Sequence, residues 1–276
     1  SNGPPRSAMS IAPRSIPRLL ATWSYRGFGS GEPHDSRSTE EGFLSERNVT
    51  YDMPTYRRTT RIPAPIDEVT SAIRSARPDV VFAPHVETSA GIILPDAYIS
   101  AMAKAAHEVG ALMVLDCIAS GCVWVDMAAT GVDVLISAPQ KGWSSTPSAG
   151  LVMLSRPALE RLEDTRSDSF TLDLKKWRQI MEAYLAGGHA YHATMPTDSL
   201  RAFRDTMVES REMGFAALCD AQWRLGEGVR ACLAERGLDS VAAPGFAAPG
   251  VVVCYTDDPE IQSGAKFAAQ GMQIAA

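Results

Sequence analysis

Three short apolar runs in the middle of the chain each end in a group of polar residues. The runs cover residues 80–82, 112–115 and 133–136, and they are followed by residues 85–91, by Asp116 and by residues 137–141, respectively. Short, continuous apolar runs are typical of buried strands. In an open α/β sheet, the carboxyl ends of parallel strands lie at the edge where ligands bind. The sequence therefore predicts an α/β protein whose functional site is formed by these three strand ends.

Helical patterns separate the predicted strands. Residues 66–76 and 96–109 are both predicted to form helices; in the second, apolar side chains recur at 3.6-residue spacing and Gly110 follows its end. A strand, a helix and the next strand then make a βαβ unit with parallel strands. A further strand over residues 150–154 follows after only a tight loop, so we expect it to pair antiparallel or to lie at the sheet edge. We assign residues 61–200 to one large domain, which carries the three polar strand ends.

Both ends of the chain differ from this regular pattern. Residues 1–60 form an atypical segment, whose first 31 residues contain four arginines and no acidic residue. This composition resembles that of a transit peptide, but we favour a poorly ordered segment. Part of the run 48–61 has the composition of an edge strand. Residues 201–276 are predicted to hold a linking helix and part of a small C-terminal α/β domain, with a strand over residues 250–255. We expect that domain to be incomplete, because the chain ends soon after this strand.

Composition and charge exclude several classes of protein. The net charge of -6 and the pI near 5.4 argue against nucleic acid as a partner, because phosphate binding requires a basic surface. No apolar run approaches the roughly 20 residues of a membrane span, so we expect no membrane contact. The five cysteines form an odd set without a CxxC pair, which fits neither a disulfide framework nor a zinc site. Reduced thiols are typical of the cytoplasm, and we predict a cytoplasmic protein without bound metal.

Asp116 and Lys141 carry the chemistry that this arrangement of strand ends suggests. The chain has 21 arginines but only five lysines, so a lysine directly after a buried strand stands out. A lysine amine condenses with the aldehyde of pyridoxal 5'-phosphate to an imine, and a carboxylate keeps the pyridine nitrogen protonated, which makes the ring an electron sink. Lys141 is also suited to carry the proton that leaves the substrate Cα. We therefore predict pyridoxal phosphate as the cofactor, with Lys141 and Asp116 as catalytic residues.

Each of these residues also has a purely structural interpretation. Asp116 could cap the following turn, and Lys141 could be a solvated loop residue. Thr88 and Ser89 could close a turn through side-chain hydrogen bonds, and His85 is more typical of a core histidine than of a catalytic one. Because the polar groups follow three strands in succession, we favour the cofactor site.

Five motifs together resemble one enzyme family. They are Glu87-Thr88-Ser89-Ala90-Gly91, Asp116-Cys117-Ile118-Ala119-Ser120, Gly131-Val132-Asp133, Ser137-Ala138-Pro139-Gln140-Lys141 and Tyr191-His192-Ala193-Thr194-Met195-Pro196. From about residue 63 to the end, the chain resembles the class V pyridoxal-phosphate aminotransferases, in particular the alanine–glyoxylate and serine–glyoxylate (or –pyruvate) branch. The resemblance implies fold type I, a three-layer α/β sandwich with a mostly parallel seven-stranded sheet, a small C-terminal domain and a homodimer. It further implies that Lys141 bears the imine and that Asp116 meets the pyridine nitrogen.

The same resemblance implies a wider set of cofactor-binding residues. These are Thr88, Asp116, Gln140, Lys141, Tyr191 and Thr194. Thr88 would hydrogen-bond the ring substituents, and Gln140 would reach the phosphate. Tyr191 and Thr194 would reach the phosphate of the neighbouring subunit in an active site shared by the dimer. Several donors around one phosphate are the expected arrangement for so highly charged a group.

The implied activity is the transfer of an amino group from a small amino acid, such as alanine or serine, to a 2-oxo acid such as glyoxylate or pyruvate. One alternative is a degenerate homologue that binds the cofactor or a partner chain without turnover. It is motivated by Pro139 before Gln-Lys, by the absence of a glycine- and threonine-rich phosphate cradle in residues 1–60, and by the lack of a C-terminal substrate arginine. A second alternative is a lyase such as a cysteine desulfurase, which needs an activated thiol on a mobile loop. The cysteines here lie in apolar runs or helices.

Overall fold

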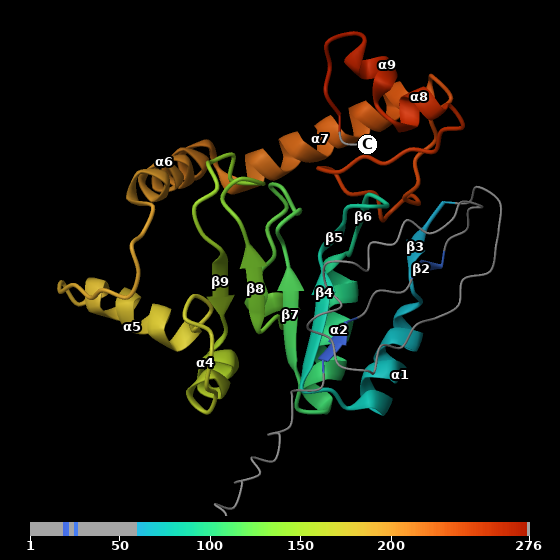
Figure 1. The fold of residues 1–276 in the computed structure, drawn as a ribbon. Coiled ribbons are helices and arrows are strands. Elements are labelled where there is room, and N and C mark those ends of the chain that lie inside the picture. The colour runs from blue at the N-terminus through green and yellow to red at the C-terminus, as the bar shows by residue number, and fades with distance from the viewer. Residues whose placement is uncertain (1–18, 22–24, 27–59, 275–276) are drawn as a thin grey trace, which may run out of the picture.

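A mixed five-stranded sheet forms the centre of the protein (Figure 1). The computed structural model describes residues 19–21, 25–26 and 60–274. The sheet order is β1 (Leu19–Ala21), β4 (Val80–Pro84), β7 (Leu112–Asp116), β8 (Val134–Ser137) and β9 (Leu151–Leu154). The first four strands are parallel, and β9 pairs antiparallel with β8 at the end of this order. This mostly parallel sheet confirms the predicted α/β class and the predicted place of β9.

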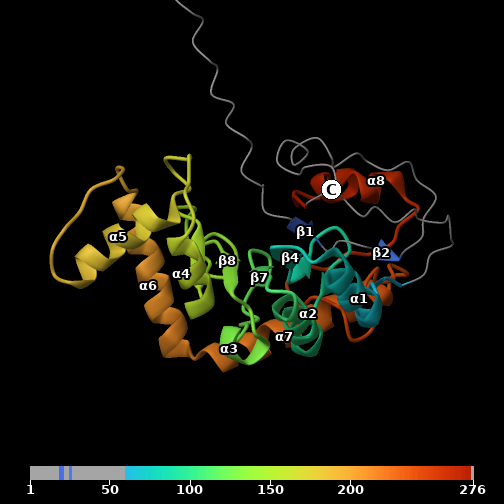
Figure 2. The ribbon, with the colours of Figure 1, turned by 90° about the horizontal axis from the view of Figure 1, so that it is seen from below.

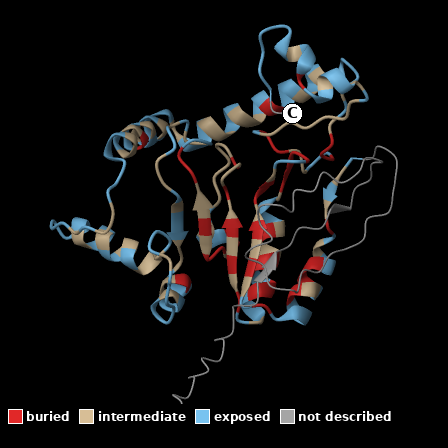
Figure 3. Ribbon diagram, viewed as in Figure 1, coloured by how far each residue is buried: buried red, intermediate tan, exposed pale blue. Residues whose placement is uncertain are grey.

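Helices α1 (Ile66–Ala76) and α2 (Asp96–Glu108) cover one face of the sheet, as Figures 1 and 2 show from two directions. Successive side chains of a strand point to opposite faces, and in the central strands every second one is buried under these helices. The buried core consists mainly of Val81, Ala83, Met113, Leu115 and Leu135 from the strands, Val69 and Ile73 from α1, and Ile99, Met102, Ala103, Ala105 and Ala106 from α2. Figure 3 shows this core as red bands on the strands and on the inner sides of the two helices. The alternate strand residues, such as Leu112 and Val114, are half-buried on the opposite face.

A small two-stranded hairpin, separate from the central sheet, follows β4. It consists of β5 (Val86–Glu87) and β6 (Ile92–Ile93), and residues 241–255 of the C-terminal part pack over it. Gly91 lies at the closest approach, with φ +65°, and a Cβ atom there would lie 2.8 Å from the carbonyl oxygen of Val251. Only glycine therefore fits this position without displacing the overlying chain.

The predicted strand over residues 250–255 is wrong. Among the described residues, its one β-bridge is an isolated one between Cys254 and Ser240. Val251, Val253 and Tyr255 instead pack against the β5–β6 hairpin and its neighbours. The apolar run thus buries its side chains on an existing surface, and an apolar run alone does not distinguish that from a strand.

The second half of the chain is mostly helical, as the sequence indicates. The remaining elements are β2 (Tyr25–Arg26), β3 (Ile62–Pro63), α3 (Met127–Thr130), α4 (Arg156–Glu163), α5 (Leu174–Leu185), α6 (Thr197–Met213), α7 (Phe215–Ala234), α8 (Pro259–Gln262) and α9 (Ala265–Ala268). Gly214, with φ +91°, separates α6 from α7. Helix α7 crosses above the carboxyl ends of β7 and β8 (Figure 1). Within the described ranges, no helix combines the length and the apolar character needed to cross a bilayer.

The predicted helices over residues 66–76 and 96–109 are confirmed, the second to within one residue. Most of the atypical segment 1–60 lies outside the described residues, and so does most of the possible edge strand over residues 48–61. The division at residue 200 into a large domain (61–200) and a partial C-terminal domain (201–276) stays a prediction. The described residues form a five-stranded sheet, and the seven strands that the resemblance implies stay a prediction.

The buried side chain of Asp133 connects the sheet to two neighbouring helices through hydrogen bonds. Its Oδ2 atom accepts a hydrogen bond from the backbone N–H of Met113 at 2.8 Å and lies 2.8 Å from Nε2 of His107. Its Oδ1 atom accepts a hydrogen bond from the hydroxyl of Ser155 at 3.0 Å. One carboxyl group thus joins β7, α2 and the start of α4. This explains the Gly131-Val132-Asp133 motif in structural terms.

Replacing Asp133 with alanine is expected to lower the free energy of unfolding by about 3 kcal/mol, because a buried backbone N–H and a hydroxyl lose their acceptors. Urea unfolding followed by circular dichroism measures the change. The matched control is Asp126→Ala, which removes the exposed cap of α3 and should cost only about 1 kcal/mol. Equal losses in the two variants would contradict the anchoring role of Asp133.

Candidate functional site

The register of the parallel strands brings the polar strand ends together. Asp116, the last residue of β7, lies opposite Pro84 of β4 on one side and opposite Ile136 of β8 on the other. The backbone N–H of His85 donates a 2.8 Å hydrogen bond to the carbonyl of Asp116, and the N–H of Cys117 donates one to the carbonyl of Ile136. The ends of three strands are therefore bound to one another at the edge where the sequence predicts the site.

Asp116 is held in a defined orientation by its own loop. Its Oδ1 atom accepts a hydrogen bond of 2.8 Å from the backbone N–H of Ile118. Along β7 the carboxylate follows Leu112 and Val114 in the two-residue alternation of the strand, so it points away from the face that α1 and α2 cover. The next residue, Cys117, is buried, and burial raises the pKa of its thiol to about 12. That thiol is therefore uncharged and unreactive at neutral pH.

Lys141 lies in a tight turn four residues after the end of β8. The N–H of Ser144 donates a 3.0 Å hydrogen bond to the carbonyl of Lys141, and the N–H of Ser145 donates one of 3.0 Å to the carbonyl of Pro139. The lysine side chain is exposed, and among the described residues its ammonium group has no hydrogen-bond or ion-pair partner. The backbone of the turn therefore determines where the amine is presented.

Two glycines join the Lys141 turn to the loop that follows Asp116. A Cβ atom on Gly142 would overlap the carbonyl group of Gly121, so the two backbones touch. Cys122 lies in the same contact, with its Sγ atom 3.7 Å from the carbonyl oxygen of Gly142. The loop after β7 and the turn after β8 thus form one packed unit, which carries the carboxylate and the amine.

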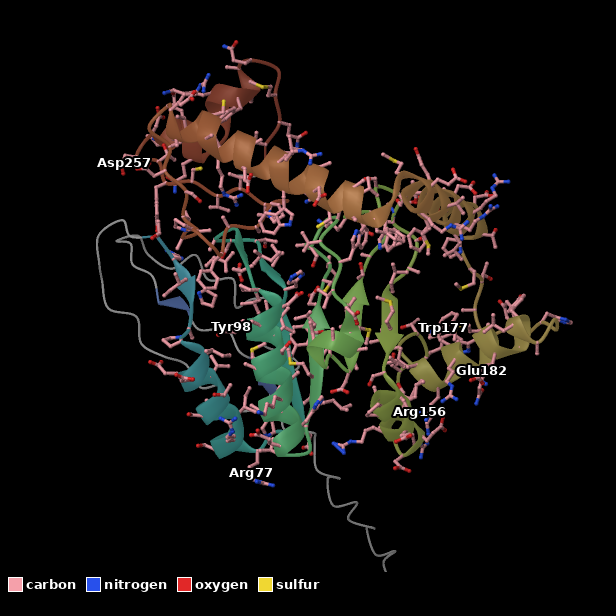
Figure 4. All side chains as sticks on the ribbon, turned by 180° about the vertical axis from the view of Figure 1, so that it is seen from behind. Arg77, Tyr98, Arg156, Trp177, Glu182 and Asp257 are labelled. Atoms are coloured by element: carbon pink, nitrogen blue, oxygen red, sulfur yellow. The ribbon has the colours of Figure 1, made fainter. Side chains whose placement is uncertain are left out.

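The other predicted cofactor ligands are more widely placed. Gln140 is exposed beside Lys141, and Thr88 is exposed in the turn that joins β5 to β6. Tyr191 and Thr194 lie in the connection between α5 and α6, with their hydroxyl oxygens 3.2 Å apart. That connection runs beyond the β9 edge of the sheet, on the side where Figure 4 shows Trp177 and Glu182 of α5, and not near β7. Within one chain, the structure brings Asp116, Gln140 and Lys141 to one edge and leaves Tyr191 and Thr194 apart.

His85 has the structural role that the sequence favours. It is buried, and its Nδ1 atom lies 2.7 Å from the hydroxyl oxygen of Ser120 in a buried hydrogen bond. Burial lowers the pKa of His85 to about 4, against a smaller opposing effect of the Leu94 backbone. The neutral ring thus joins the end of β4 to the loop after Asp116.

This burial predicts a specific loss of stability in acid. In the unfolded chain a histidine titrates near 6.5, so between pH 6.5 and pH 4 the unfolded state binds more protons than the folded state. Stability therefore falls as the pH is lowered through this range, by about 3 kcal/mol for His85 alone. The measurement is urea unfolding from pH 7 to pH 4.5, where His85→Gln should show a shallower dependence than the parent. The exposed His189→Gln is the control, and a parental slope in His85→Gln would contradict the argument.

Sequence reasoning did not single out the aromatic residues that surround the Lys141 turn. Trp143, two residues after the lysine, lies with its ring centroid 4.9 Å from that of Trp124, 5.8 Å from Phe203 and 6.2 Å from Phe215. Trp124 also donates its indole N–H to the carbonyl oxygen of Phe215 at 3.0 Å. These contacts join residues up to about 90 positions apart, and no local spacing signals them. We call these four residues the four-ring cluster.

Comparison with known proteins identifies the family. The family described as Aminotransferase class-V matches residues 46–238. The chain belongs to this family. The match includes every residue of the predicted site, from Thr88 to Thr194, and it confirms the resemblance stated from the motifs.

Relatives of known sequence carry related names. The 2-aminoethylphosphonate–pyruvate transaminase of Syntrophobacter fumaroxidans is 31% identical over 177 residues, which cover 60% of this chain and 46% of the relative. The enzyme of the same name from Burkholderia mallei (strain SAVP1) is 33% identical over 187 residues, 65% of this chain and 48% of the relative. The chain thus spans about half the length of these relatives.

Solved structures show the fold. The alanine–glyoxylate aminotransferase of Nostoc sp. superposes with a TM-score of 0.67 at 24% identity, over 75% of this chain and 54% of that one. The ureidoglycine–glyoxylate aminotransferase of Bacillus subtilis gives a TM-score of 0.66 at 21% identity, over 81% and 57%. These likenesses confirm that the class V chain has the predicted aminotransferase fold.

Family membership also supports the predicted cofactor, pyridoxal 5'-phosphate, and the residues present fit it. Asp116 offers a carboxylate and Lys141 an amine at the ends of neighbouring parallel strands. The hydroxyl of Ser145, in the Lys141 turn, is buried and has no hydrogen-bond partner in the described part of the chain. A buried hydroxyl without a partner is costly, and an anionic group such as a phosphate would satisfy it. The donor set therefore suits a phosphorylated aldehyde.

Proposed function

We propose that this class V chain is an aminotransferase that moves an amino group from a small amino acid, such as alanine or serine, to a 2-oxo acid such as pyruvate or glyoxylate. The observation that carries the proposal is the arrangement of Asp116 and Lys141. They follow two hydrogen-bonded parallel strands, and the loops that carry them touch at Gly121 and Gly142. A carboxylate and an amine fixed in this way are the two groups that amino-group transfer requires.

Pyridoxal phosphate, when bound, supplies an aldehyde for the amine and a ring that takes up the electrons of the substrate Cα–H bond. Asp116 would hold a proton at the ring nitrogen, and its bond from the Ile118 N–H would keep the carboxylate in place. Lys141 would bind the aldehyde in the resting enzyme and then carry the proton away from Cα. Its amine is suited to this second task, because no described residue holds it in an ion pair. Gln140 and Thr88 would bind the polar substituents of the cofactor.

We further propose a homodimer in which Tyr191 and Thr194 serve the active site of the partner. The connection that carries them lies far from β7 in its own chain (Figure 1), and the Tyr191 side chain is 78% exposed. Large apolar side chains of the same region are also exposed, and they include Phe170, Leu172, Met181, Tyr184 and Leu185. Exposed apolar surface of this kind is typical of an interface.

We also propose a cytoplasmic location. All five cysteines are free thiols, and free thiols are typical of that compartment.

The amino donor has a second candidate. The relatives from S. fumaroxidans and B. mallei are named for 2-aminoethylphosphonate and pyruvate, so 2-aminoethylphosphonate belongs in any test of donors. A desulfurase has less support, because Cys232, the one thiol of the five that is exposed, lies in the last turn of α7 and not on a loop. A homologue that binds the cofactor without turnover is the remaining alternative, and experiment separates it from the enzyme.

The test combines trapping with turnover. The chain is purified with pyridoxal phosphate and reduced with borohydride, and the adduct is located by mass spectrometry among the five lysines. We expect the adduct on Lys141, with Lys104, Lys175, Lys176 and Lys266 unmodified. Turnover is then measured with a 2-oxo acid as the amino acceptor, glyoxylate for alanine and serine and pyruvate for 2-aminoethylphosphonate. The products measured are pyruvate from alanine, hydroxypyruvate from serine and the aldehyde from 2-aminoethylphosphonate. An adduct without turnover of any donor would favour the binding-only homologue, and the absence of an adduct at Lys141 would refute the cofactor site.

A further inference from the structure

The turn that carries Lys141 is fixed to the rest of the molecule by rings, not by the lysine itself. Inside the turn, two backbone hydrogen bonds of 3.0 Å close residues 139–145. Ser144 adopts φ +54°, a conformation that a residue with a side chain rarely takes without outside support. The Lys141 side chain has no partner in the described part of the chain, so the support comes from the backbone contact of Gly142 with Gly121 and from neighbouring side chains.

Trp143 is the side chain in a position to provide it. Its ring contacts three others at centroid distances of 4.9, 5.8 and 6.2 Å, two of them edge-to-face. These are favourable separations and orientations for aromatic pairs. The partners come from three separate segments: Trp124 from the loop after β7, Phe203 from α6 and Phe215 from the start of α7. The Lys141 turn is therefore attached to both helices that lie above the strand ends (Figure 1).

The loop of Asp116 is attached to the same helix by a second contact. The side-chain Oε1 atom of Gln222, in α7, accepts a hydrogen bond of 2.5 Å from the backbone N–H of Cys122. Gln222 also fills the space that a Cβ atom on Gly121 would need. Helix α7 thus holds the loops of both proposed catalytic groups, the Asp116 loop through Gln222 and the Lys141 turn through the four-ring cluster.

We propose that Trp143 is a positioning residue, whose ring in the four-ring cluster sets the place of the Lys141 amine above the end of β8. This inference rests on the proposed function of Lys141. Trp143 does not touch the reacting atoms in this role; it acts through the backbone of the turn. A small error in the position of a reacting group is enough to slow a reaction strongly, so loss of this ring should affect the amine before it affects the fold.

The experiment uses three variants and a measurement that needs neither cofactor nor turnover. Trp143→Leu removes the ring, and Trp143→Phe keeps an aromatic side chain. The control, Trp223→Leu, removes a tryptophan of α7 that is also half-buried but packs on Val86 and Ala248. Trace acetylation with acetic anhydride between pH 6 and pH 10 gives the pH profile of each lysine by mass spectrometry. We expect Trp143→Leu to change the profile of Lys141 and to leave that of Lys104 unchanged. Trp143→Phe and Trp223→Leu should keep the parental profile.

Borohydride trapping supplies the second measurement. Half-maximal trapping at Lys141 should need about tenfold more pyridoxal phosphate in Trp143→Leu than in Trp143→Phe or the parent. If Trp143→Leu does not fold, Phe203→Leu and Phe215→Leu remove the partners of the ring and should give the same change. The inference is overturned if the ring-removing variants label and trap like the parent, or if Trp223→Leu changes Lys141 equally. A changed acetylation profile in a chain that forms no adduct would keep the positioning role and refute the proposed function.

Discussion

Replacing Lys141 with alanine is expected to abolish the trapped adduct and to reduce turnover of the amino donor by about 10³-fold or more, because the same amine captures the cofactor and carries the proton. The expected loss is this large because no second amine is available at the site. The other four lysines are Lys104 on α2, Lys175 and Lys176 on α5, and Lys266 on α9, and none of these elements forms the strand-end edge. The measurement is the rate of 2-oxo acid formation with saturating donor.

The matched control for this variant is Lys104→Ala. Lys104 is exposed, as Lys141 is, and its replacement should leave the activity at the parental level. The urea midpoint should be unchanged in Lys141→Ala, because no described residue bonds the ammonium group that is lost. Added methylamine should restore part of the activity if only the amine is missing. A variant that turned over at the parental rate would refute the proposed mechanism.

The sequence predicted the part of the structure that depends on short-range pattern. The apolar runs before Asp116 and Lys141 are β7 and β8, and the helical spacing from Asp96 onward is α2. Because parallel strands place their carboxyl ends at one edge, the position of each polar group after its strand was enough to predict a common site. The register of β7 against β8 confirms that these two strand ends are neighbours at Asp116 and Ile136, and the site itself stays a prediction.

The sequence did not predict features that depend on distant contacts. The run 250–255 looks like a strand but packs on the β5–β6 hairpin, since an apolar run only specifies burial and not its partner. The ring contacts of Trp143 and the Gln222 bond to Cys122 cross up to 100 positions of the chain. No local pattern signalled that the connection between α5 and α6 lies beyond the β9 edge. The role of Tyr191 and Thr194 across a dimer was implied only by the family resemblance and stays a prediction.

Asp116→Asn should separate binding of the cofactor from its use. Asparagine keeps the side-chain oxygen that accepts the hydrogen bond from the Ile118 N–H, so the loop should keep its conformation and the urea midpoint should change little. The amide has no negative charge, however, and cannot hold a proton at the pyridine nitrogen as a carboxylate does. We therefore expect the Lys141 adduct to form while turnover falls by about 10³-fold.

This pattern differs from that of every other variant considered for the site. Lys141→Ala loses both adduct and turnover, and Trp143→Leu weakens adduct formation. Only Asp116→Asn should trap the cofactor at Lys141 with parental efficiency and still fail to release pyruvate from alanine. Asp96→Asn, an exposed aspartate at the start of α2, controls for the loss of one negative charge. Parental turnover in Asp116→Asn would mean that the carboxylate of Asp116 does not act on the ring nitrogen of the cofactor. Asp116 would then only cap the turn, through its hydrogen bond from the Ile118 N–H.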